Sequence, residues 1–359
     1  MHSVQSVRAG NRGPACTQAK HFMQDFRICT SVPTLILRCD SCGNVPPRGD
    51  IMTLTEQIET IQPLCAQSME AARRCLRELA LPLGSLGLLE GAVVQVAGIQ
   101  RTPRPVLDKR AAVVFCADNG VVAQGVTQCG QEVTAAVTEN MDAGKSAVCL
   151  MAARIGIDVF PVDIGVSREV RGQKIIRRKL MNGTDDFTQK PAMTREICLR
   201  ALETGMEMAA LRAQEGYHIL CAGEMGIGNT TSAAAVTAAF LGVPPEVVTG
   251  RGAGLSGEGL ARKTEVVRRA LALHCPDPSD PVDVLSKVGG LDIAGMAGLY
   301  LGGARCGVPV VMDGVISAAA ALAAVRLCPL AKDYILASHQ SAEPAGRLLL
   351  DALGMHPFL

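Results

Sequence analysis

The residues best suited to chemistry lie in a glycine-rich segment at positions 221–232, which reads CAGEMGIGNTTS. Gly226 and Gly228 would let backbone N–H groups approach an anion, and the helical period that follows at 233–241 would turn its positive end towards that anion. Asn229, Thr230 and Thr231 add donors at the same place. No lysine follows the glycines as in an ATP-binding P-loop. The segment predicts a phosphate cradle, and a tight turn with a threonine cap is the alternative.

A second glycine cluster, GRGAGLSG at 250–257, leads into a helical period at 258–274. Its GxGxxG match would suggest a dinucleotide fold and an NAD-dependent oxidoreductase. Only four residues, 246–249, stand between two prolines and this cluster, and just the last three, 247–249, are of strand type, which leaves little room for the buried strand that such a fold requires. We therefore interpret it as a second anion loop, with Arg251 and Lys263 as candidate phosphate partners. Solvated basic side chains are the alternative for these two.

These loops need a scaffold to position them, and short apolar runs typical of strands predict that scaffold. The runs cover residues 111–116, 157–162, 218–222, 308–312 and 334–337, and each ends in polar or glycine residues before a helical period. Strands that are apolar along their length predict a doubly wound, mostly parallel α/β sheet covered by helices on both faces. Ligands bind at the carboxyl ends of such strands. Asp118, Asp163 and Asp313 stand there, with helix capping or turn formation as the alternative to substrate contact.

The sequence pattern divides the chain into an N-terminal segment, a helical part and an α/β domain. Residues 1–51 lack a sustained period, and we expect a disordered or artefactual upstream extension, with a targeting peptide as the rival. Apolar spacing of three and four predicts one amphipathic helix over 53–80 and another over 88–97, before a Pro-containing linker at 100–105. We expect a small helical part at 52–105, an α/β domain at 106–345, and a C-terminal return to the helical part at 346–359.

Composition excludes several classes of protein. The 359 residues are 48% apolar and 19% charged, with a net charge of +1, which excludes a disordered or nucleic-acid-coating chain. The basic run at 171–179 has no interleaved aromatics and is expected to be a solvated face. The 14 cysteines are scattered, which indicates a reducing compartment. Cys39 and Cys42 form an isolated CxxC, so we expect no metal site. No run of about 18 uncharged apolar residues predicts a membrane span.

Several separated motifs together resemble one known family. They are PLGSLG at 82–87, ADNG at 117–120, QEVT at 131–134, GEMGIGNTT at 223–231, KVGG at 287–290, DG at 313–314 and SHQSAE at 338–343. In this order they resemble the nicotinate-nucleotide:dimethylbenzimidazole phosphoribosyltransferases. The resemblance implies that a benzimidazole nitrogen attacks C1′ of nicotinate mononucleotide, releasing nicotinate in the assembly of the cobalamin lower ligand. It also implies a bacterial cytoplasmic homodimer that needs no cofactor and binds no nucleic acid.

The resemblance and the loops together indicate the site residues. We expect the nucleotide and its phosphate to contact Gly226, Gly228, Asn229, Thr230, Thr231, Gly250, Arg251, Gly252, Gly254, Lys263, Asp313, Ser338 and Ser341. The flat apolar base needs a pocket with few polar groups. Its expected walls are Val126, Cys129, Val137, Met225 and Ile227.

The sequence departs from the family at its end. The family's glutamate that is regarded as the general base lies in an RLGEG motif shortly after the stretch matching residues 355–359, and this sequence stops at Leu359. We expect a truncated sequence in which Glu224 carries the catalytic carboxylate, with capping of the next helix as its alternative role. A non-catalytic nucleotide-binding homologue is the rival function. Asn119 replaces a histidine common in the family, which we interpret as variation within a turn.

Overall fold

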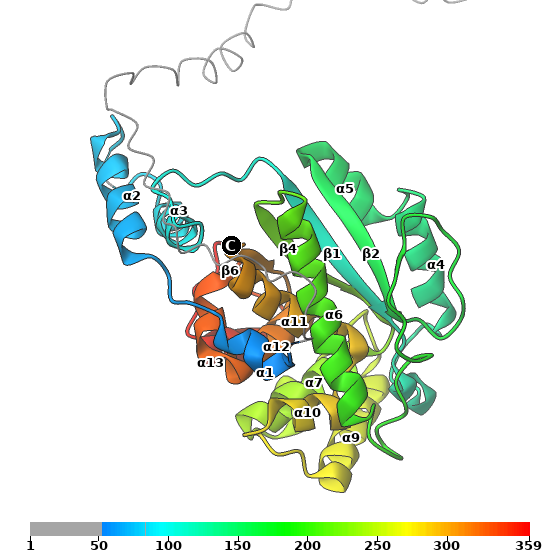
Figure 1. Ribbon diagram of the computed structural model, residues 1–359. Coiled ribbons are helices and arrows are strands. Elements are labelled where there is room, and N and C mark those ends of the chain that lie inside the picture. Colours follow the sequence, from blue (N-terminus) through cyan, green and yellow to red (C-terminus); the bar gives the residue numbers. More distant parts are fainter. Residues whose placement is uncertain (1–51, 83) are drawn as a thin grey trace, which may run out of the picture. The chain divides into compact units, whose positions relative to one another are not determined.

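A parallel sheet forms the centre of the computed structural model, which describes residues 52–82 and 84–359 (Figure 1). Its six strands follow the order β3-β2-β1-β4-β5-β6. The strands are β1 (Arg110–Ala117), β2 (Ile157–Gly165), β3 (Ile176–Arg177), β4 (Ile219–Met225), β5 (Val310–Met312) and β6 (Ile335–Ala337). Every pairing is parallel, so the predicted doubly wound α/β fold is confirmed. The direction of strand succession reverses between β1 and β4, where such folds bind ligands.

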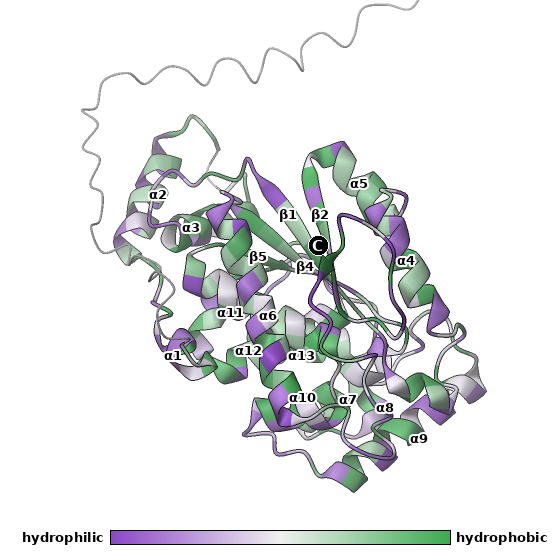
Figure 2. Cartoon of the chain, turned by 45° about the vertical axis from the view of Figure 1, so that its right-hand side comes forward, coloured by the Kyte–Doolittle hydropathy of each residue, from purple (hydrophilic) through white to green (hydrophobic). Residues whose placement is uncertain are grey.

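The sheet is covered on both faces, which explains why its strands are apolar throughout. In β1, Val113 and Phe115 face the larger core together with α6 (Arg195–Gln214) and α11 (Leu291–Cys306). Val114 and Cys116, on the opposite side of the same strand, pack against α4 (Glu132–Asp142). Figure 2 shows the hydrophobic colouring of the strands between these helix layers.

Helix α11 lies against α6 at very short range because glycines line the contact. A Cβ atom at Gly205 would stand 2.0 Å from the carbonyl oxygen of Gly295, and one at Gly298 would stand 2.0 Å from that of Leu202. Gly302 would likewise meet Met206 at 2.7 Å. The glycine content of 291–306 is therefore a packing requirement, and it brings the N-terminal end of α11 to the sheet.

Strands β1, β2 and β4 extend further at their carboxyl ends than the apolar runs predicted, whereas β5 and β6 are shorter than theirs. Strand β4 continues to Met225 because it pairs with β1 as far as Cys116, so Glu224 is part of a strand. Strand β2 similarly includes Asp163. Helix α7 (Asn229–Leu241) begins earlier than the predicted helix. Polar residues at a strand end can still be paired when the neighbouring strand offers backbone partners.

The single helix predicted over 53–80 is wrong. The structure has α1 (Leu54–Glu59) and α2 (Ala66–Glu78), separated by a segment with Pro63, whose missing N–H and fixed φ disfavour helix continuation. Thr53 caps α1 in a capping box, and the Cys65 sulfur caps α2. Helix α3 (Leu88–Ile99) agrees with the second predicted helix.

The remaining elements complete the unit formed by residues 52–359. They are η1 (Gly120–Gln124), α5 (Ala147–Ile155), α8 (Pro245–Val248), α9 (Gly257–His274), α10 (Pro281–Val288), α12 (Val315–Leu327), η2 (Pro329–Tyr334) and α13 (Ala345–Leu353). The expected upstream extension at 1–51 and the CxxC of Cys39 and Cys42 lie outside the described residues. The division into a small helical part and an α/β domain stays a prediction. Across the described ranges, no helix has both the length and the apolar character to cross a membrane.

Candidate active site

The carboxyl ends of β1 and β4 carry the acidic centre of the site. Glu224 pairs in register with Phe115 of β1, so its side chain emerges on the sheet face that α11 covers. The first turn of α11 begins at this point and contains Asp292. Helix α7 starts with Asn229 only five residues after Glu224. Three separate elements therefore bring one polar side chain each to the place where the strand order reverses.

Asn229 joins the two carboxylates. Its Nδ2 donates to Oε2 of Glu224 at 2.5 Å and to Oδ2 of Asp292 at 2.9 Å. Oδ1 of Asp292 accepts from the N–H of Ile293 at 3.0 Å. Asn229 and Asp292 are buried, whereas Glu224 keeps part of its surface accessible. Glu224 is thus the member of the cluster that can meet a substrate.

The electrostatics of this cluster favour proton binding. Burial raises the pKa of Glu224 to about 7, the Asp292 charge adds to this, and the hydrogen bond from Asn229 opposes it. Burial also raises the pKa of Asp292, to about 6, against the hydrogen bonds from Asn229 and Ile293. A carboxylate with a raised pKa is a stronger base than an ordinary glutamate near neutral pH.

The capping alternative for Glu224 is wrong, because α7 begins differently. Its N-cap is Gly228 in the left-handed region at φ 95°, and no side chain of the described residues caps the helix. A Cβ atom at Gly226 would stand 2.6 Å from both the carbonyl oxygen of Ala117 and Oδ2 of Asp292. These glycines allow close packing around the acidic cluster. Their predicted contact with a phosphate stays a prediction.

A buried ammonium group from α9 contacts Thr230, the residue that follows Asn229 in α7. Lys263 of α9 is 1% exposed, and its Nζ donates to Oγ1 of Thr230 at 2.8 Å. Burial lowers the pKa of Lys263 to about 8, and the charge of Glu343 opposes this. Gly252 lies next to this pair, since a Cβ atom added to it would stand 3.0 Å from Oγ1 of Thr230 and 3.5 Å from Nζ of Lys263. The two predicted anion loops therefore meet at Thr230.

The rest of the second glycine loop is held by side chains from elsewhere. The N–H of Gly252 donates to Oε1 of Glu343 at 3.1 Å. Gly250 has no room for a Cβ, because Glu343 and Pro344 occupy that space. Arg251 donates to the carbonyl oxygen of Leu255, which closes the loop on itself. Gly254 accepts from the side chain of Gln128, and both Gly254 and Arg251 are exposed.

The GxGxxG match does not have the structural context of a dinucleotide site. Helix α8, rather than a strand, precedes it, and α9 follows at Gly257. A dinucleotide fingerprint requires the turn between a buried strand and a helix. The oxidoreductase alternative therefore has no support in the fold.

The C-terminal motif contributes to the same region through Ser341. Its Oγ accepts from the N–H of Glu343, the residue that binds the Gly252 amide. Ser338 hydrogen-bonds through its hydroxyl to Nδ1 of His339. Asp313 follows β5, is 73% exposed at its side chain, and has that same Nδ1 at 3.8 Å. Thr231, in contrast to Thr230, is fully buried.

The predicted walls of the base pocket lie in different environments. Met225 and Val137 both pack against the apolar cluster between the sheet and α4. Ile227 donates its N–H to Oγ1 of Thr134, also on α4. Val126 is 1% exposed within the larger core, and Cys129 is exposed. Val137 is therefore part of α4, and Met225 and Ile227 lie beside that helix, whereas Val126 belongs to the other core.

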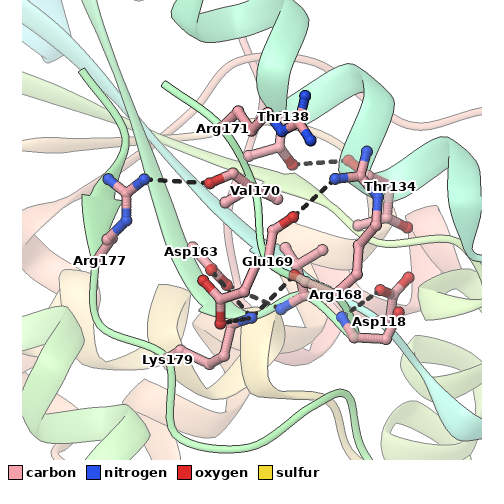
Figure 3. Close-up of polar contacts among 12 residues, drawn as sticks. Asp118, Thr134, Thr138, Asp163, Arg168, Glu169, Val170, Arg171, Arg177 and Lys179 are labelled. Atoms are coloured by element: carbon pink, nitrogen blue, oxygen red, sulfur yellow. Dashed lines mark hydrogen bonds and ion pairs between the residues drawn. The ribbon is translucent and has the colours of Figure 1, made fainter. Parts of the chain in front are cut away.

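Asp118 and Asp163 hold the chain that follows β2, as Figure 3 shows. Oδ2 of Asp118 accepts from the N–H of Ser167 at 2.7 Å, and its Oδ1 is buried without a hydrogen-bond partner within the described ranges. Oδ1 of Asp163 accepts from the N–H of Val166 at 2.9 Å, and Nζ of Lys179 lies 3.6 Å from Oδ2. The structure thus gives both aspartates a role in fixing a loop.

The expectation of a solvated face for the basic run at 171–179 is wrong in part. Residues 176–177 form the edge strand β3. Arg177 donates to the carbonyl oxygens of Gly172 and Val170. The side chain of Lys179 is only 19% exposed and neutralises buried Asp163. A buried acid, which the sequence does not reveal as a neighbour, draws Lys179 inward, whereas Arg177 stays exposed while it binds the backbone carbonyls.

Three buried or half-buried groups were missed by sequence reasoning. Asn119 is buried, and its Oδ1 accepts from Ser232 of α7 at 3.0 Å, so it is a fixed junction and not a variable turn position. Asp292 stands two residues after the KVGG motif. The Gly-Gly pair directly before a helix could have indicated that a residue of the first helical turn belongs to the site. Glu343 ends the SHQSAE motif, but nothing local in the sequence connects it to Gly252.

The chain matches known proteins over most of its length. A family model described as phosphoribosyltransferase matches residues 61–359. The chain is 44% identical over 306 residues to the nicotinate-nucleotide–dimethylbenzimidazole phosphoribosyltransferase of Acetivibrio thermocellus, covering 85% of this chain and 87% of that one. It is 46% identical over 307 residues to the protein of the same name from Chloroflexus aggregans, with coverage of 85% and 87%.

A solved structure agrees in fold. The crystal structure of CobT from Thermus thermophilus superposes with a TM-score of 0.78 at 42% identity, covering 82% of this chain and 88% of that chain. The likeness therefore extends from the sequence to the three-dimensional arrangement of most of the chain. On these grounds the chain belongs to the nicotinate-nucleotide–dimethylbenzimidazole phosphoribosyltransferase family.

Proposed function

We propose that this chain transfers the ribose 5-phosphate of nicotinate mononucleotide to 5,6-dimethylbenzimidazole or a related base. The products are nicotinate and an α-riboside 5′-phosphate, the nucleotide of the cobalamin lower ligand. The names of the relatives support the substrates. One observation about this chain carries the proposal. Two consecutive residues of α7 bind the two groups that the reaction needs: Asn229 binds the basic carboxylate of Glu224, and Thr230 binds the buried ammonium of Lys263.

The reaction needs one proton acceptor. The unprotonated ring nitrogen of the base forms a bond to C1′ while the bond from C1′ to nicotinate breaks, and its electron pair stays on the nicotinate nitrogen. The benzimidazole ring becomes cationic, so its remaining N–H is acidic. Glu224 takes this proton, and its raised pKa of about 7 suits that role. Asn229 and Asp292, the other members of the cluster, are buried, whereas Glu224 is partly accessible to the base.

The phosphate needs a cationic partner and N–H or O–H donors. Lys263 supplies the charge, Thr230 supplies a hydroxyl, and the Gly252 loop supplies main-chain groups within reach of both. The positive end of α7 adds a favourable dipole. Met225, Val137 and Ile227 are the side chains we assign to the wall for the base.

Nicotinate release from nicotinate mononucleotide and 5,6-dimethylbenzimidazole tests the proposal. We expect turnover by the purified chain, a loss of about 10²-fold or more in kcat for Glu224→Gln, and no change for the matched control Glu203→Gln on the exposed surface of α6. Tight nucleotide binding with no turnover by the unmodified chain would instead identify a binding protein. Normal turnover by Glu224→Gln would refute its role as base.

The family resemblance also leads us to propose a homodimer that acts in the bacterial cytoplasm. Light scattering coupled to gel filtration measures the mass directly, and a monomer at micromolar concentration would contradict the dimer. Fractionation of producing cells tests the compartment.

A further inference from the structure

We propose that Asp292 is a positioning residue for Glu224, acting through the side-chain amide of Asn229, which holds both carboxylates. The inference rests on the proposed role of Glu224 as general base. It assigns different roles to two acids, proton acceptor for Glu224 and positioning residue for Asp292. The sequence does not place them together, since they are separated by 68 positions.

The hydrogen-bond inventory distinguishes the two acids. Asn229 has two amide hydrogens, and each is used by a different carboxylate. Asp292 accepts on both oxygens, from Asn229 and from the N–H of Ile293, and it is fully buried. Its lone pairs are therefore engaged by donors that favour the ionised form. At neutral pH, above its pKa of about 6, Asp292 is a buried negative charge, and with both oxygens engaged it is not the group that takes the substrate's proton.

Glu224 is arranged differently. One of its oxygens accepts from Asn229, and its side chain keeps part of its surface accessible. The amide of Asn229 prevents the carboxylate from rotating freely, while the buried charge of Asp292 makes it more basic. Glu224 is consequently held in one orientation as the group that takes the proton.

Other titratable groups around the two acids come from β1 and β5 and the residues that follow these strands. Asp313, after β5, also raises the pKa of Glu224. Asp118, after β1, acts on Asp292 and raises its pKa further. Cys116 of β1 stays neutral, since burial raises its pKa to about 12. Asp313 is exposed and makes no hydrogen bond to the cluster among the described residues, so Asp292 is the acid that orders it.

Two variants with opposite expected effects test this arrangement. Asp292→Asn removes the buried charge, so the acid limb of the kcat/KM profile should move to lower pH by about 0.5 units or more. Asn229→Ala removes a hydrogen bond to the ionised form, so the limb should move to higher pH by a similar amount, with kcat reduced about tenfold or more because the carboxylate is no longer oriented. Asp283→Asn, in the first turn of α10, is the matched control, and its profile should not move.

A purely structural role for Asp292 would lower kcat in both variants and leave the midpoint of the acid limb unchanged. That outcome, or shifts of the same sign in both, would overturn the inference. Circular dichroism and thermal midpoints establish that each variant is folded, and Asp292→Ser, which also removes the buried charge, takes the place of Asp292→Asn if that variant does not fold. Failure of the proposed function has a different signature, namely normal turnover by Glu224→Gln.

Discussion

Replacing Lys263 by methionine should stabilise the protein and weaken its binding of the nucleotide. The pKa of Lys263 falls from its usual 10.5 to about 8 because of burial. At about 1.4 kcal/mol per pKa unit, this corresponds to roughly 3 kcal/mol against the charged form at neutral pH. Loss of the hydrogen bond to Thr230 offsets about 1 kcal/mol or more. Since methionine fills a similar volume, we expect a net gain of about 1–2 kcal/mol in the free energy of unfolding.

The pH dependence has a definite sign. The folded-state pKa of Lys263 lies below its unfolded value, so the folded state holds fewer protons between about pH 8 and pH 10.5. The penalty is complete below pH 8 and disappears as the pH rises through that interval. The stability difference between Lys263→Met and the unmodified protein should therefore be largest at about pH 7 and shrink towards about pH 10.

The functional effect should be opposite. A hydrogen bond from a charged donor to a phosphate is worth about 1.5–3 kcal/mol, so the KM for nicotinate mononucleotide should rise about 10-fold to 150-fold. Denaturant unfolding measures the stability, and nicotinate release measures KM. Lys145→Met, at an exposed position, is the matched control and should change neither. A lower stability together with an unchanged KM would refute both the burial argument and the phosphate site.

Four further substitutions test the packing and the loop network. Gly226→Ala should abolish most activity, because the added methyl group meets Oδ2 of Asp292 at 2.6 Å, and normal activity would show that the loop can yield. Gly298→Ala should lower the free energy of unfolding by about 1–3 kcal/mol or more in a denaturant titration, since α6 and α11 must separate, and an unchanged midpoint would contradict that packing. Lys179→Met should destabilise by about 1–3 kcal/mol at pH 7, whereas Asp163→Asn should cost less, because burial already raises the pKa of Asp163. Equal losses would exclude the proposed pairing.

Much of the scaffold could be predicted from the sequence because strand and helix signals are local. The apolar runs identified every strand of the described residues except β3, whose two residues lie in a basic segment. The helix over 53–80 failed because apolar spacing was given more weight than Pro63. Strand ends were underestimated because Glu224 and Asp163 are polar, and their inclusion depends on backbone partners in β1.

The candidate site was predicted only in part. Thr230, Gly252 and Lys263 were named from two glycine-rich loops, and the structure brings them together. Asp292 and Glu343 were not named, although each contacts a residue that was. A lone acid in an apolar helix or after a serine-rich turn carries no local signal of its partner.

The order of residue types along the chain determined the parallel sheet, the two glycine loops and the family. Tertiary structure alone decided which acid is basic and which cation is buried. The physical reason is that pKa and charge pairing depend on distance and desolvation. Both arise when α7, α9 and α11 converge on the end of β4, and no sequence spacing records that convergence.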